Sequence, residues 1–175
     1  MMLVACSLCS LLTFPTRDIS RLFAHEQQQL SVTKQCAATP TDDRLSGIVG
    51  PMVGRDPVWL VDGSSGWRNS EPVKTLWVLS RQVAGVFQVR GHRLDGNGFA
   101  AFKRAVGDAS SDALVIPDPL QRSLRPGGAS HEMMASYAFI PTYVIYPTSG
   151  CWELTAQLGA RTVRIVREFS RDPKG

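Results

Sequence analysis

The chain has 175 residues, of which 43% are hydrophobic and 19% are charged, and this composition is typical of one folded domain with flanking segments. Its net charge is +4, and the basic residues are scattered along the sequence instead of forming a run. Nucleic-acid binding needs basic side chains concentrated on one face, so we expect no nucleic-acid partner.

Residues 1–14 form an apolar segment without a charged side chain. The segment is shorter than the about 20 apolar residues that cross a bilayer, and its length suits the hydrophobic region of a signal peptide. Within it, Leu3-Val4-Ala5-Cys6 resembles the bacterial lipobox, which makes Cys6 the lipidation candidate. The basic start of most signal peptides is missing, so a lipid anchor, plain secretion and no export all stay open.

Residues 15–56 are interpreted as an N-terminal segment and linker. Leu22 and Phe23 lie at partly helical spacing behind a cap at Thr16, which predicts a short helix. Residues 33–51 are rich in Thr, Asp, Pro and Gly, which is typical of irregular structure.

From Pro57 onward, short apolar or alternating runs are separated by turn residues. No long helical pattern lies between these runs, which favours antiparallel strands over an α/β fold. We therefore expect an all-β fold, an immunoglobulin-like sandwich of about seven strands over residues 57–170, followed by a tail at 171–175. The expected strands lie within residues 58–61, 73–80, 85–94, 112–119 and 142–147, and in the hairpin described next.

The C-terminal residues predict a β-hairpin. In residues 151–158, apolar residues such as Trp152 alternate with polar ones, as in a strand with one buried face. Residues 161–169 form the return strand, and Gly159-Ala160 fits a two-residue type II′ turn in which glycine supplies the positive φ. We therefore expect Trp152 to anchor the core and Gly159 to be structural.

The turn Pro147-x-x-Gly150 leads into Cys151-Trp152-Glu153-x-Thr155 and follows FIPTYVIYP. This pattern resembles the C-terminal part of an uncharacterised group of bacterial secreted or lipid-anchored proteins with an immunoglobulin-like domain. The segment QVRGHRLDG, with His92 in place of an arginine, is similar to another segment of that group. The resemblance implies a fold, a structural Gly150 and an envelope location, and it implies no catalytic residue and no cofactor.

Cys36 and Cys151 are the disulfide candidates. In an exported chain Cys6 is lipidated or removed with the signal, and Cys9 can leave with it, which makes Cys36 and Cys151 the obvious pair. The alternative is a thiol- or metal-dependent enzyme built around Cys151 and His131. No histidine lies in a catalytic signature, so we expect no catalysis.

The segment SHEMM contains His131, Met133 and Met134, which together suit a soft metal ion such as copper. A periplasmic or extracellular copper-binding protein is therefore a further alternative. The competing interpretation is a loop with His131 exposed and both methionines partly packed.

Two groups of residues are candidates for binding. Trp67 lies among small polar residues, which favours an exposed loop position. Arg90, His92 and Arg93 form a basic set at the end of a strand and could contact an anion or a partner. Our leading hypothesis is an exported, lipid-anchored or secreted, non-enzymatic module that binds an unknown protein or small ligand at the cell envelope. It would touch the membrane only through the lipid anchor.

Overall fold

The structure, a computed structural model, describes residues 36–61 and 68–169. Four features of the sequence lie outside these residues: the apolar segment with Cys6, the helix expected behind Thr16, Trp67, and the C-terminal tail.

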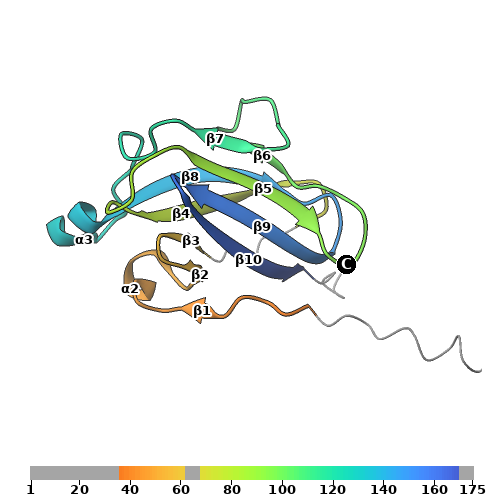
Figure 1. Cartoon of the computed structure of the whole chain (residues 1–175), viewed down its shortest axis with the longest axis horizontal. Helices are drawn as coiled ribbons and strands as arrows, with labels where there is room; N and C mark the ends of the chain where they lie inside the picture. The colour runs from red at the N-terminus through yellow and green to blue at the C-terminus, as the bar shows by residue number, and fades with distance from the viewer. Residues whose placement is uncertain (1–35, 62–67, 170–175) are drawn as a thin grey trace, which may run out of the picture. The chain divides into compact units, whose positions relative to one another are not determined.

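Ten β-strands and two short helices occupy the described residues (Figure 1). No helix in these ranges is long and apolar enough to cross a membrane. The elements in chain order are β1 (Thr41–Asp42), α2 (Ser46–Val49), β2 (Met52–Arg55), β3 (Val58–Val61), β4 (Pro72–Ser80), β5 (Phe87–Arg93), β6 (Ala101–Lys103), β7 (Leu114–Ile116), α3 (His131–Ser136), β8 (Tyr137–Ile145), β9 (Gly150–Leu158) and β10 (Arg161–Phe169).

The strands form two antiparallel sheets that pack face to face. The larger sheet has six strands in the order β1-β2-β3-β4-β8-β6, and the smaller has four in the order β10-β9-β5-β7, which lie side by side in Figure 1. Every neighbouring pair is antiparallel. The all-β sandwich that the sequence predicts is therefore confirmed, whereas its immunoglobulin-like character stays a prediction.

Aromatic side chains from both sheets build the core between them. Trp77 of the larger sheet and Phe87 of the smaller are fully buried, with ring centroids 5.3 Å apart. The buried Trp77 Nε1 donates a hydrogen bond of 3.0 Å to Thr142 Oγ1, so its polar atom is satisfied. Trp152 is also fully buried, with its ring centroid 5.5 Å from that of Tyr146, as the alternation of β9 predicts.

A second, smaller cluster covers part of the outer face of the six-stranded sheet. It contains Met52, Trp59 and Phe139, and Met133 and Met134 of α3 pack against it. β4 therefore contributes to both clusters, which explains why its sequence is apolar at consecutive positions instead of alternating.

The β9–β10 hairpin has the register that the sequence predicts. Leu158 pairs with Arg161, which leaves Gly159 and Ala160 as a two-residue turn. Gly159 has φ +54°, while Ala160 is not among the residues with positive φ, so the turn is type II′.

The sandwich has ten strands instead of about seven, and it includes residues upstream of Pro57. β1 and β2 pair with each other and with β3 in the six-stranded sheet. The strands beyond the expected seven are β1, β2 and β6, which have only two to four residues each. Strands this short are formed by pairing with neighbours, because they are too short to carry an alternation of their own.

Candidate binding groove

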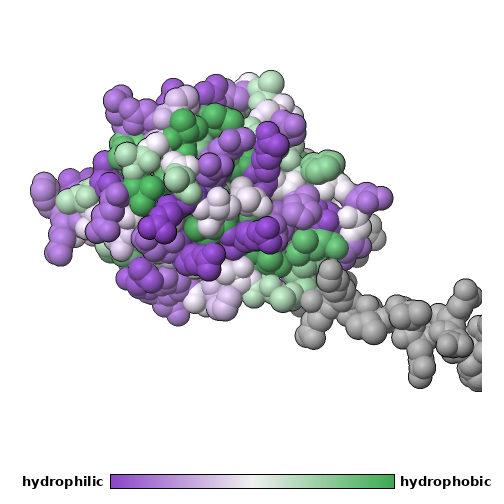
Figure 2. Space-filling model, viewed as in Figure 1, coloured by the Kyte–Doolittle hydropathy of each residue, from purple (hydrophilic) through white to green (hydrophobic). Residues whose placement is uncertain are grey.

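The outer face of the four-stranded sheet is polar. Antiparallel sheets with one buried face turn alternate residues to solvent, and here Arg90 of β5 and Gln157 of β9 lie on that outer face. The register places Gln88 opposite Gln157 and Arg90 opposite Thr155. Hydrophilic residues cover much of the surface seen in Figure 2.

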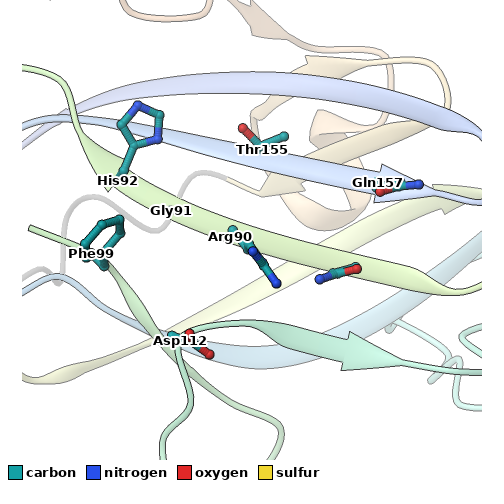
Figure 3. A pocket seen from close by; sticks show the side chains of 8 residues that line it. Arg90, Gly91, His92, Phe99, Asp112, Thr155 and Gln157 are labelled. Atoms are coloured by element: carbon teal, nitrogen blue, oxygen red, sulfur yellow. The ribbon is translucent and has the colours of Figure 1, made fainter.

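A groove of about 700 Å³ lies on this face. We call it the β5 groove. Figure 3 shows that Phe99 and Asp112 lie on one side of β5, and that Thr155 and Gln157 lie on the other. The groove is lined by Gln88, Arg90, Gly91, His92, Phe99, Asp112, Thr155 and Gln157.

The groove forms where the pairing of β5 with β7 ends and its pairing with the segment before β6 begins. β7 pairs with β5 only as far as Val89. Beyond that residue, Ala100 N donates to Gly91 O at 3.0 Å, and Phe99 bridges to His92. The connections before β6 and after it therefore bring Phe99 and Asp112 beside the outward side chains of β5.

Gly91 lets the backbone of β5 lie close to the core at this point. A Cβ on Gly91 would lie 2.7 Å from Leu154 Cδ2 and 2.8 Å from Ala100 Cβ. Real side-chain atoms do not approach so closely, so glycine is required for this packing. The floor of the groove is backbone, with Arg90 and His92 on either side of it.

The side chains of Arg90, Asp112 and the histidine of the β5 groove have no partner among the described residues. Among the described residues, Arg90, His92 and Asp112 make no side-chain hydrogen bond and no ion pair. Two other lining residues have partners: Thr155 Oγ1 donates to Glu153 Oε1 at 3.3 Å, and Gln157 Nε2 donates to Gly159 O at 2.9 Å. The unpartnered charges of both signs are thus available to a ligand.

A second hollow of about 530 Å³ lies beside the first. The two share Asp112, and the second is lined by residues of β6, β7 and their connection, with Arg104 Nε 3.8 Å from Asp108 Oδ2. Asp112 therefore borders both hollows.

Arg93 does not line the β5 groove, although it neighbours His92 in sequence. Its Nε lies 2.7 Å from Asp95 Oδ1, and its Nη1 donates to Thr148 Oγ1 at 3.2 Å. The hydrogen bond from Arg93 lowers the pKa of Asp95 below its ordinary value. A Cβ on Gly150 would lie 2.7 Å from Arg93 Nε, so Gly150 leaves room for this arginine. The side chain of Arg93 therefore stabilises the turn before β9 and does not line the groove.

Cys151 is joined to Cys36 by a disulfide, with a Cα–Cα distance of 5.5 Å. A sulfur in a disulfide is not a nucleophilic thiolate. His131 begins α3 just before β8, and Cys151 follows β8, so the length of that nine-residue strand separates them (Figure 1). At about 3.3 Å per residue the strand is roughly 30 Å long. The structure does not bring Cys151 and His131 together.

The SHEMM segment forms a helix instead of a loop. Met133 N donates to the Ser130 side chain at 3.1 Å, which caps the N-terminus of α3. Met133 and Met134 are half-buried against the second cluster, whereas His131 is exposed. The described part of the chain holds no group of three or more His, Cys, Asp or Glu residues that could bind a metal ion.

Fold and groove together define an antiparallel β-sandwich with an open polar face. Neither a protein-family model nor a curated protein matches the sequence. A solved structure from Bacillus anthracis, described as a putative lipoprotein, has a similar fold, with a TM-score of 0.50 and 14% sequence identity over 81% of this chain and 92% of that chain. At this identity the likeness supports the fold alone.

Sequence reasoning identified Arg90 and His92 but missed the other side chains of the groove. Gln88, Thr155 and Gln157 occupy outward positions of alternating strands, so their orientation was predictable although the pairing of β5 with β9 was not. Phe99 and Asp112 lie in connections, and no local pattern links them to β5.

Proposed function

We propose that this protein is a non-enzymatic binding module of the cell envelope and that the β5 groove holds its ligand. The observation that carries the proposal is the set of unpartnered charges, Arg90 and Asp112, facing a groove of about 700 Å³. Ligand sites in proteins have this size range and place a few polar groups around a concave surface.

The envelope location is supported by three features. The disulfide between Cys36 and Cys151 suits an oxidising compartment. Leu3-Val4-Ala5-Cys6 resembles a lipobox, and the Bacillus anthracis protein of similar fold is described as a putative lipoprotein.

Mass spectrometry of the protein from its native membrane tests the location. The proposal predicts a processed chain with lipid on Cys6 and with Cys36 bonded to Cys151. A processed chain without lipid would indicate secretion instead. An unprocessed chain with free thiols would contradict an envelope location.

The groove is tested with the full chain and a single charge substitution. Arg90→Gln should weaken binding to components of the native envelope, separated into polysaccharide and protein fractions, by about ten- to a hundredfold, since a charged hydrogen bond contributes roughly 1.5–3 kcal/mol. Arg161→Gln is the matched control, because Arg161 is an exposed strand arginine that does not line the groove. Equal binding by wild type and Arg90→Gln to every fraction would reject the groove as the site.

A further inference from the structure

We propose that the ligand of the β5 groove is an uncharged saccharide chain. This inference rests on the proposed function and names the ligand class for the same groove. Four features of the groove support it. They are the opposite charges of its lining, its amide and hydroxyl side chains, its exposed aromatic ring Phe99, and the second hollow beside it.

The walls of the groove offer both donors and acceptors without internal partners. The guanidinium of Arg90 can only donate, and the carboxylate of Asp112 can only accept. Figure 3 shows the Arg90 side chain extending to the side of β5 on which Asp112 lies. A hydroxyl group both donates and accepts, so neighbouring hydroxyls of a sugar satisfy both walls together.

A simple anion fits the groove less well than a neutral polyol. It would pair with Arg90, but Asp112 lines the same groove and would repel it. Gln88 adds an amide that both donates and accepts, and Thr155 Oγ1, which donates to Glu153, can still accept. The chemistry of the lining therefore matches a ligand with many hydroxyls and no net charge.

Phe99 supplies an apolar surface beside these polar groups. The residue is 74% exposed, although most aromatic residues of the described ranges are buried. One face of a pyranose ring carries mainly C–H groups and can stack on an aromatic ring. A stacked sugar would cover Phe99 while its hydroxyls reach Arg90 and Asp112.

The apolar area on this face is small for a protein partner. Of the large hydrophobic residues that are exposed in the described ranges, only Phe99 lines the β5 groove and only Val115 lines the second hollow. The buried centre of a protein interface is mainly apolar, and specific interfaces cover about 800 Å² on each partner. The scattered apolar groups here favour a polar ligand.

The second hollow beside the β5 groove points to a chain instead of a single sugar. Asp112 borders both hollows, so a ligand held at Phe99 and Arg90 can extend past Asp112 toward Arg104 and Asp108. A linear oligosaccharide of several residues has that extended form.

Isothermal titration of the full-length protein tests this proposal with defined tetrasaccharides: the β-1,4 tetramers of glucose and of N-acetylglucosamine, the α-1,4 tetramer of glucose, and the α-1,4 tetramer of galacturonate as the acidic arm. At least one neutral tetrasaccharide should bind. Asp112→Asn and Phe99→Ala should each weaken that binding by about tenfold. Asp43→Asn and Val106→Ala are the matched controls, since both residues are exposed and line neither hollow.

A second measurement separates failure of this inference from failure of the proposed function. Envelope material that binds in an Arg90-dependent way is treated either with glycosidases, which cleave glycosidic bonds, or with protease. Loss of binding after the glycosidases alone supports a saccharide. Loss after protease alone, or binding of galacturonate without any neutral tetrasaccharide, overturns the saccharide and leaves the groove as the binding site. Binding that Asp112→Asn and Phe99→Ala both leave intact overturns the inference.

Discussion

Gly159 holds the closing hairpin in a conformation that side chains rarely adopt. Its φ is +54°, and a Cβ at this position would lie 2.5 Å from Ala84 O. Gly85 faces the same contact, since its own Cβ would lie 2.7 Å from Gly159 Cα. Two segments distant in sequence therefore meet backbone to backbone at this turn.

Gly159→Val should lower the free energy of unfolding by about 2–4 kcal/mol, because a β-branched residue combines positive-φ strain with a clash against Ala84 O. Urea denaturation of the full chain measures this change. Ala160→Ser, at the exposed neighbouring position, should change stability by less than about 0.5 kcal/mol. An unchanged unfolding midpoint for Gly159→Val would disprove the register.

Asp95 gives the turn before β9 a dependence on pH. Its pKa is lowered, first by the hydrogen bond from Arg93. A lowered pKa stabilises the folded state at pH values above the unfolded pKa, and this stabilisation is lost as pH falls through the folded pKa.

Asp95→Asn should therefore be less stable than wild type near neutral pH, and the difference should shrink toward zero in strong acid. Urea midpoints of both proteins across the acidic range measure it. Because the pair is partly exposed, the difference should also decrease at high salt. A difference that persists at the lowest pH would show that the carboxylate charge is not the cause.

Individual residues were predictable where the signal was local. Trp152 and Gly159 follow from the alternation of one strand and the chemistry of one turn. Phe99 and Asp112 were not predictable, because their place beside Arg90 is set by how β7 ends and by which segment next pairs with β5. The local sequence around a polar residue in a connection does not indicate which residues of other segments will lie near it.

At the scale of elements, the segment after Cys36 protects an edge of the four-stranded sheet. Thr39 N donates to Val166 O at 2.9 Å, and Val166 N donates to Thr39 Oγ1 at 2.8 Å. β10 is an edge strand, and unpaired edges promote association with other strands. The disulfide from Cys36 to Cys151 of β9 holds this segment in place.

Replacing both cysteines, in Cys36→Ala/Cys151→Ala, should lower the free energy of unfolding by about 4 kcal/mol, since the bond closes a loop of more than 100 residues. Urea denaturation measures the loss, and the Val166 amide should exchange with solvent faster than in wild type. A reductant should destabilise wild type but not the double variant. If both proteins unfold at the same urea concentration, the bond has no stabilising role.

Strand prediction succeeded for β3, β5, β9 and β10, whose apolar or alternating runs are bounded by turn residues. It failed for β1 and β2, because their segment is rich in turn formers and becomes strand only by pairing with β3. The strand conformation of β1 and β2 depends on their tertiary pairing, which cannot be predicted from a local sequence pattern.

At the scale of the whole sandwich, the two outer faces differ. The six-stranded sheet carries a second apolar cluster on part of its outer face, with α3 packed against it. The four-stranded sheet turns polar side chains and the β5 groove outward. This asymmetry is why we assign ligand binding to the four-stranded sheet.

Hydrogen–deuterium exchange of the full chain, with and without the native envelope fraction that binds it, tests this assignment most directly. We predict slower exchange at residues 99–113 and at the flanking part of β5 when the fraction is bound. The apolar depression over Val61, Leu76 and Pro141 on the other sheet should stay unchanged. Protection confined to that depression, with none at residues 99–113, would contradict the account.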